Sequence, residues 1–139
     1  MDSDSSPDRV VDVLVVDDHE DTRIILREYL SAHGYRVREA SNGEEAIAEL
    51  RRACPDVMVL DIRMPKVDGL TVLRSVRGDA RLCSLPVLAL SAHALPDEMR
   101  EISEAGTDAY LTKPAEPREI LYAVRSLLAG RSGRSAAGT

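Results

Sequence analysis

The sequence predicts an α/β fold in which a parallel, doubly wound, five-stranded sheet carries helices on both faces. Short apolar runs alternate along the chain with longer segments of helical periodicity, and this alternation is typical of βαβ units. Three of the five apolar runs are continuous and aliphatic, as in strands that are covered on both faces. A chain of 139 residues is long enough to bury the core of one such domain without disulfides.

The five apolar runs are the expected strands. They cover residues 11–16, 36–40, 57–60, 87–90 and 109–111. Because the chain contains no Phe and no Trp, the core of this sheet has to be aliphatic.

The segments between and after these runs have the periodicity of amphipathic helices. The expected helices cover residues 21–33, 42–52, 70–77, 96–105 and 117–128. In the first helix the stripe of Ile24, Ile25 and Leu30 is expected to face the sheet, and Gly34 and Gly106 follow the first and fourth helices as stops. Residues 1–9 and 130–139 lack periodicity and are rich in Gly, Ser and charge. They are expected to be disordered tails of one domain over 10–129.

Composition excludes several classes of function. A net charge of −6 argues against direct binding of nucleic acid. No apolar run approaches the roughly 20 residues that a membrane span needs, and the acidic N-terminus does not resemble a signal peptide. A cytoplasmic location is therefore expected. Cys54 and Cys83 lack metal-ligand spacing, so both are expected to be reduced.

Polar residues follow four of the five expected strands. Asp17 and Asp18 follow the first, Asp61 the third, Ser91 the fourth, and Lys113 lies just beyond the fifth. In a parallel sheet the carboxyl ends of the strands form the ligand-binding edge. Converging carboxylates repel unless a cation compensates them, and Mg²⁺ suits a site of few carboxylates. A carboxylate, a divalent cation, an ammonium group and a hydroxyl group together can support phosphoryl transfer.

Each of these residues also has an ordinary structural explanation. Asp18 or Asp21 could cap the first helix, Ser91 could be a turn residue, and an isolated Lys113 could be solvated. Their joint occurrence at the ends of different strands favours a functional site.

The motifs occur in a fixed order along the chain. They are Val-Leu-Val-Val-Asp17-Asp18, Val-Met-Val-Leu-Asp61-Ile-Arg-Met-Pro65, Asp68-Gly69, Leu-Ala-Leu-Ser91-Ala92, Gly106 and Tyr110-Leu-Thr-Lys113-Pro114. With these motifs the chain resembles the response-regulator receiver domains of two-component signalling, in particular the chemotaxis-regulator-like single-domain regulators. The resemblance covers about residues 11–128 and implies a flavodoxin-like sheet with the strand order 2-1-3-4-5.

The resemblance also implies a role for each site residue. Asp61 is the implied phosphoacceptor, which receives its phosphoryl group from a histidine of a sensor kinase or of a phosphotransfer protein. The implied cation is Mg²⁺, with Mn²⁺ as the alternative, held by Asp18, Asp61 and the backbone carbonyl of Arg63, with Asp17 acting through water. Lys113 would pair with the acyl phosphate, and the bond between Lys113 and Pro114 would be cis.

Two further pairs of residues are implied to set the behaviour of the phosphorylated form. Ser91 matches the switch hydroxyl, and Tyr110 matches the switch aromatic residue. Arg63 and His93 lie two residues after Asp61 and Ser91, where family members differ and tune the lifetime of the acyl phosphate. We hypothesise that the Arg63 side chain screens the phosphoryl group from water. A faster loss of phosphate from Arg63→Ala would support this.

The chain is expected to be a stand-alone switch and not an enzyme. It is expected to act on an effector protein and to work as a monomer or as a phosphorylation-dependent dimer. The expected docking face comprises the helix from Pro96, the fifth strand and the last helix, with the candidate contacts Met99, Tyr110, Tyr122 and Arg125. Three alternatives remain. The chain could be a receiver excised from a hybrid kinase or longer regulator, or a module with an inactive site. It could also be a haloacid-dehalogenase-type phosphohydrolase, but this sequence lacks the Asp-x-Asp motif that such an enzyme needs.

Overall fold

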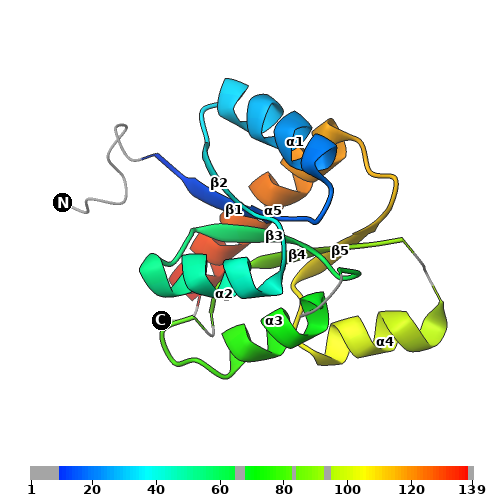
Figure 1. Ribbon diagram of the computed structural model, residues 1–139. Coiled ribbons are helices and arrows are strands. Elements are labelled where there is room, and N and C mark those ends of the chain that lie inside the picture. Colours follow the sequence, from blue (N-terminus) through cyan, green and yellow to red (C-terminus); the bar gives the residue numbers. More distant parts are fainter. Residues whose placement is uncertain (1–9, 65–67, 83, 93–94, 138–139) are drawn as a thin grey trace.

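The structure is a computed structural model that describes residues 10–64, 68–82, 84–92 and 95–137. Its strands form one parallel sheet in the order β2-β1-β3-β4-β5, as the sequence predicts (Figure 1). The strands are β1 (Asp12–Val16), β2 (Arg36–Ala40), β3 (Val57–Asp61), β4 (Val87–Ser91) and β5 (Ala109–Thr112).

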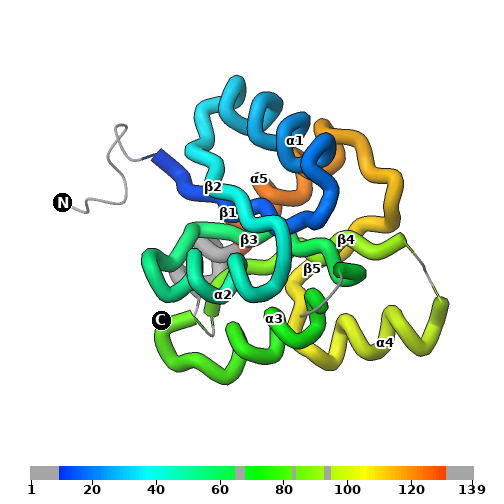
Figure 2. Tube along the Cα trace, viewed as in Figure 1, coloured from blue at the N-terminus to red at the C-terminus, as the bar shows by residue number. Residues whose placement is uncertain are grey.

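A helix follows each strand, so that the sheet is covered on both faces. The helices are α1 (Glu20–Ala32), α2 (Gly43–Arg52), α3 (Gly69–Arg77), α4 (Pro96–Glu104) and α5 (Pro117–Ala137). Helices α1 and α5 pack on one face of the sheet, and α2, α3 and α4 pack on the other (Figures 1 and 2). The predicted fold class is thereby confirmed. No helix in the described part of the chain is long and apolar enough to cross a membrane.

The core consists of two aliphatic layers, one on each side of the sheet. Successive strand residues point to opposite faces, so Leu14 and Val16 of β1 pack under α2 and α3, whereas Val13 and Val15 pack under α1 and α5. All four of these side chains are fully buried. Strands covered on both faces hold the polar residues that follow them in fixed positions at the carboxyl edge.

The predicted buried stripe of α1 is wrong in part. Leu26 and Leu30 are buried, but Ile24 and Ile25 are exposed. Residues four apart lie on the same face of a helix. The pair of Leu26 and Leu30 therefore sets which face of α1 meets the sheet, and Ile24 and Ile25 fall outside it.

The ends of the elements differ from prediction by about one residue, except at α5. The structure continues α5 to Ala137, whereas the sequence predicts an end near Leu128 and a disordered tail over 130–139. The segment after Leu128 contains no Pro, and adding residues to a helix already formed requires no new nucleus. Residues 130–137 are thus helical here. The predicted tail over residues 1–9 lies outside the described residues.

Both the starts and the ends of the helices follow local sequence signals. Asn42 caps α2 by accepting a hydrogen bond from the amide of Glu45, at 2.8 Å. Gly34 and Gly106 have φ angles of +94° and +102° after α1 and α4, a conformation that glycine adopts readily. Both were predicted as helix stops.

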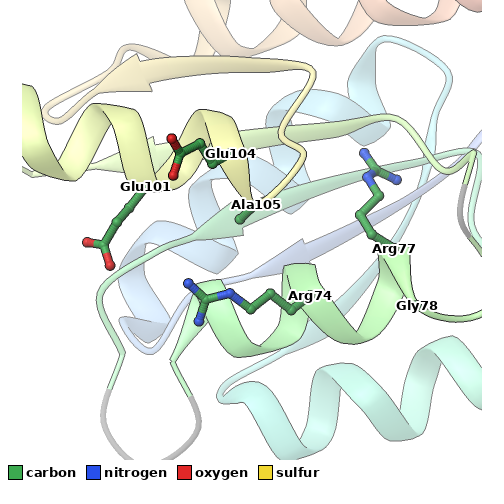
Figure 3. A pocket seen from close by; sticks show the side chains of 6 residues that line it. All are labelled: Arg74, Arg77, Gly78, Glu101, Glu104 and Ala105. Carbon is green, nitrogen blue, oxygen red and sulfur yellow. The ribbon is translucent and has the colours of Figure 1, made fainter.

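Helices α3 and α4 meet at a surface cavity of about 450 Å³. Figure 3 shows the side chains at its rim, with Arg74 and Arg77 from α3 opposite Glu101 and Glu104 from α4. The Arg77 guanidinium donates hydrogen bonds to the carbonyls of Gly106 and Leu85 and to the Asp108 carboxylate. This arginine therefore ties α3 to the loops that precede β4 and β5.

Candidate functional site

Four side chains from different parts of the sequence meet at the carboxyl edge of the sheet. Asp17 directly follows β1, Asp61 ends β3, Ser91 ends β4, and Lys113 directly follows β5. The side chains of Asp17 and Asp61 are only 1% and 3% exposed, and Ser91 is buried as well. The structure therefore brings together the residues that the sequence predicts for this edge.

The Lys113 ammonium group bridges the two buried carboxylates. Its Nζ atom lies 3.1 Å from Oδ2 of Asp17 and 3.0 Å from Oδ2 of Asp61. The amide of Lys113 donates to the carbonyl of Ser91 at 2.7 Å, which holds the end of β5 beside β4. The peptide bond between Lys113 and Pro114 is cis, as the resemblance implies.

Burial and the charges at this edge shift the pKa values of two groups. The pKa of Asp61 is raised, mainly by burial, although the hydrogen bond and charge of Lys113 oppose this effect. Burial by itself lowers the pKa of Lys113, but its contacts with Asp61 and Asp17 outweigh burial and raise that pKa. Lys113 and Asp61 thus each favour the charged form of the other.

A cluster of acidic side chains next to Lys113 could hold a metal ion. Asp17, Asp18, His19 and Asp61 each offer a ligand atom, and these atoms lie within 4.8 Å of one another. The buried Oδ1 atom of Asp18 accepts no hydrogen bond from any residue that the structure describes, although Nδ1 of His19 is 3.3 Å away. Carboxylate oxygens are the ligands that hard divalent cations prefer. The residues present therefore fit such a cation.

The start of α1 rules out the helix-cap explanation for Asp18 and Asp21. The residue at the N-cap position is His19, without a side-chain capping bond, and Asp21 lies in the first turn. The amide of His19 donates to Oδ1 of Asp17 at 2.8 Å, and Arg23 donates to the Asp17 carbonyl at 2.8 Å. Sequence reasoning missed His19 as a member of the cluster, and its position beside Asp18 was the available signal.

Ser91 and Arg63 both contact Glu98 in the first turn of α4. Oγ of Ser91 donates to Oε1 of Glu98 at 2.5 Å, and Nη2 of Arg63 donates to Oε2 at 2.6 Å. The amide of Arg63 donates to Oδ1 of Asp61 at 3.1 Å. Sequence reasoning missed Glu98 because no motif marks it. That Arg63 shields a phosphoryl group stays a prediction, and His93 lies outside the described residues.

Gly69, at the start of α3, leaves room for the backbone of Asp61 and Ile62. A Cβ atom at Gly69 would lie 2.5 Å from the carbonyl oxygen of Asp61 and 2.6 Å from Cα of Ile62. Both distances are shorter than real side chains tolerate. The glycine of the Asp68-Gly69 motif therefore lets α3 approach the end of β3, and Asp68 caps α3 by accepting from Thr71.

The predicted docking face is exposed in part. Tyr110 and Tyr122 are exposed large side chains, and both line a mainly apolar surface pocket of about 620 Å³ between β5 and α5. Arg125 is exposed, whereas Met99 is partly buried against the layer under α2, α3 and α4. Tyr110 and Tyr122 therefore contribute to an apolar surface that Leu111 and Leu127 also line.

The raised pKa of Asp61 makes a prediction about stability. Because its pKa lies above the ordinary value of 3.8, the folded chain holds this proton more tightly than the unfolded chain does. The stabilising contribution is therefore fully present below about pH 3.8 and is lost as the pH rises through the raised pKa. Asp61→Asn removes this titration. In chelator, its free energy of unfolding relative to wild type should rise as the pH rises above about 4. A difference that does not change with pH would contradict the burial argument.

Comparison with known proteins places this site in a family. Residues 13–125 match the model of the response regulator receiver domain. ResD, a transcriptional regulatory protein of Bacillus subtilis, is 40% identical over 116 residues, which cover 84% of this chain and 47% of ResD. The response regulator MprA of Mycobacterium tuberculosis is 42% identical over 118 residues, which cover 85% of this chain and 50% of MprA. The chain thus spans about half the length of these two relatives.

Solved structures show the same architecture. The chemotaxis protein CheY4 of Vibrio cholerae superposes with a TM-score of 0.81 at 29% identity, over 86% of this chain and 99% of CheY4. A response regulator from Chloroflexus aurantiacus, described as putative, superposes with a TM-score of 0.81 at 36% identity, over 87% and 99% of the two chains.

The family match covers all five strands apart from the first residue of β1, and it includes every residue of the polar edge. The fold with the sheet order β2-β1-β3-β4-β5 superposes on both solved structures with a TM-score of 0.81. The chain therefore belongs to the response regulator receiver domains, the signalling modules of two-component systems.

Proposed function

We propose that this receiver domain is a phosphorylation-controlled switch whose acceptor is Asp61. The observation that carries the proposal is the Lys113 ammonium group, which lies between two buried carboxylates at distances of 3.0 and 3.1 Å. A fixed positive charge beside a carboxylate suits a group that must meet an incoming phosphoryl anion. The proposed donor is a phosphohistidine of a sensor kinase or of a phosphotransfer protein.

In the proposed step, an oxygen of the Asp61 carboxylate attacks the phosphorus atom of the donor. A new P–O bond forms while the P–N bond breaks, and the histidine nitrogen leaves with the bonding electron pair and takes up a proton from solvent. Lys113 then faces the phosphoryl oxygens, and Ser91 is the hydroxyl available to donate to one of them. Water later cleaves the acyl phosphate and restores the carboxylate. Because the acceptor is the domain's own residue, we propose a signalling module and not an enzyme.

The acidic cluster would hold the divalent cation that this chemistry uses. Asp18, Asp61 and the backbone carbonyl of Arg63 are the proposed direct ligands of Mg²⁺, with Asp17 acting through water and Mn²⁺ as the alternative ion. The bound cation would supply positive charge that offsets the phosphoryl oxygens. The buried Oδ1 atom of Asp18, which accepts no hydrogen bond from the described residues, supports this assignment.

The output is proposed to pass through α4, β5 and α5 to an effector protein. Phosphorylation would shift an existing equilibrium between two arrangements, with Ser91 and Tyr110 as the switch residues. The exposed Tyr110 and Tyr122 on the apolar pocket favour a protein partner, or a second copy in a phosphorylation-dependent dimer. The net charge of −6 disfavours direct contact with nucleic acid. The proposed partners imply a cytoplasmic site of action.

The proposal applies to a stand-alone regulator and to a receiver within a longer protein. ResD and MprA are about twice as long as the region they share with this chain. A 14.6 kDa protein from Leptolyngbya boryana, described as uncharacterized, matches over 88% of its length at 38% identity. Relatives of both sizes therefore exist.

The mass of the intact protein tests the proposal. Wild-type protein incubated with Mg²⁺ and acetyl phosphate is expected to gain the mass of one phosphoryl group. Excess chelator should prevent this gain, because the carboxylates and the phosphoryl group would then lack a compensating cation. Failure to gain mass, or an equal gain in chelator, would contradict the proposal.

A further inference from the structure

Glu98 holds two residues that the proposed phosphoryl group also needs. One of its carboxylate oxygens accepts from the Ser91 hydroxyl at 2.5 Å, and the other accepts from Arg63 at 2.6 Å. The Glu98 side chain is only 14% exposed and Ser91 is buried, so solvent weakens the bond between them less than it would at an open surface. The Arg63 side chain is 55% exposed, so its bond to Glu98 is the weaker of the two. One carboxylate thus connects the end of β4, the loop after β3 and the first turn of α4.

Within the described residues, helix α4 buries little of its own surface. Ile102 is the one residue of α4 that is fully buried, and Met99 packs partly against the same core layer. A cavity of about 380 Å³ lies between α4 and the loop after β3, with Arg63 and Glu98 in its lining. The cavity that Figure 3 shows lies between α4 and α3. Two surface cavities therefore flank α4, one on the side of α3 and one on the side of the loop after β3.

The contacts of Glu98 resemble those that a phosphoryl group would make. A carboxylate and a phosphoryl group are both anions that accept hydrogen bonds from hydroxyl and guanidinium groups. Ser91 has a single hydroxyl proton, so it cannot donate fully to Glu98 and to a phosphoryl oxygen at the same time. Arg63 is linked to both sites, because its guanidinium group donates to Glu98 and its backbone amide donates to Asp61.

We propose that Glu98 is a positioning residue that competes with the phosphoryl group on Asp61 for Ser91 and Arg63. In the unphosphorylated form, the Glu98 carboxylate keeps Ser91 turned toward α4 and fixes the first turn of that helix. Phosphorylation draws the Ser91 hydroxyl away, and the freed α4 transmits the change to the docking face. Glu98 thereby sets how much donor is needed to activate the domain. This inference rests on the proposed function.

Removing the charge of Glu98 should ease phosphorylation. Glu98→Gln keeps the size of the side chain but weakens its bonds to Ser91 and Arg63, because hydrogen bonds to an ionised group are the stronger ones. The acetyl phosphate concentration that half-saturates Asp61 is expected to fall about 3- to 10-fold. In the unphosphorylated variant, the amides of Met99 and Ile102 should exchange with solvent faster than in wild type.

A matched control lies one turn further along the same helix. Glu101 is exposed and lines the same 380 Å³ cavity, so Glu101→Gln changes the charge of α4 equally and should behave as wild type. Glu98→Asp keeps the charge but shortens the side chain by one methylene, so that it should reach only one partner. The acetyl phosphate concentration that half-saturates Asp61 should therefore fall in this variant as it does in Glu98→Gln. Thermal unfolding of each variant shows whether it is folded.

The outcomes separate this inference from the proposed function. If wild type takes up no phosphoryl group, the proposed function fails. If wild type is phosphorylated but Glu98→Gln and Glu98→Asp require as much donor or more, the role of Glu98 is overturned. An equal shift in Glu101→Gln would also overturn it, because the effect would then belong to the net charge of α4.

Discussion

Replacing Asp61 by Asn is expected to abolish phosphoryl uptake while leaving the domain folded. An amide has no anionic oxygen to attack phosphorus, and loss of a nucleophile costs about 10²-fold or more in the rate of the chemical step. Asn fills the same space, and its carbonyl can still accept from Lys113 or the Arg63 amide. The intact mass after incubation with Mg²⁺ and acetyl phosphate is therefore expected to stay unchanged.

Asp68→Asn is a suitable control for this experiment. Asp68 is an exposed acidic residue near the site, and its side chain caps α3. Asn caps helices as well as Asp does. This variant should take up phosphate as wild type does. A gain in Asp61→Asn as large as in wild type would reject Asp61 as the acceptor.

Replacing Lys113 by Met is expected to reduce both phosphorylation and stability. Asp17 and Asp61 are nearly fully buried, so removing the ammonium group between them leaves two like charges without the cation that compensates them. Breaking such a buried arrangement costs about 3 kcal/mol in the free energy of unfolding at neutral pH. The rate of phosphorylation should fall about 10²-fold, because the phosphoryl oxygens lose a fixed positive charge. Chemical denaturation in chelator and the time course of the mass gain measure the two effects.

The loss of stability should depend on the charge of Asp61. If uncompensated carboxylates cause the instability, Lys113→Met should lower the free energy of unfolding much less in the Asp61→Asn background, where one of the two charges is already absent. Equal costs in both backgrounds would show that lost packing of the lysine side chain causes the instability. Because the pKa of Lys113 is raised above 10.5, its stabilising contribution should persist below about pH 10 and be lost only as the pH rises through that pKa.

Site residues that lie at the ends of strands could be predicted from the sequence. Asp17, Asp61, Ser91 and Lys113 each follow or end an apolar run, and parallel strands deliver such residues to one edge whatever the details of packing. The strand order and the cis bond came from the resemblance, since periodicity alone does not select them. The Asp68-Gly69 motif marked Gly69 as a notable residue. The sequence did not show the reason, which is the close approach of α3 to the backbone of Asp61 and Ile62.

Contacts that depend on the placement of whole helices could not be predicted. The burial of Leu26 in place of Ile24 and Ile25 depends on how α1 is rotated on the sheet, and several rotations suit an apolar segment. Glu98 reaches Ser91 only because α4 begins at Pro96 and lies beside the loop after β3. A glutamate in the first turn of a helix is common, because it interacts favourably with the helix dipole. Its sequence position therefore gave no signal of a contact with the site.

Identifying the phosphorylated residue tests the central claim most directly. Wild-type protein treated with Mg²⁺ and acetyl phosphate can be reduced with borohydride, which converts an aspartyl phosphate to homoserine, and then digested and sequenced by mass spectrometry. The account predicts homoserine at position 61 and at no other aspartate. Homoserine at Asp17 or Asp18, or a phosphoryl group that resists reduction and maps to a different kind of residue, would contradict it.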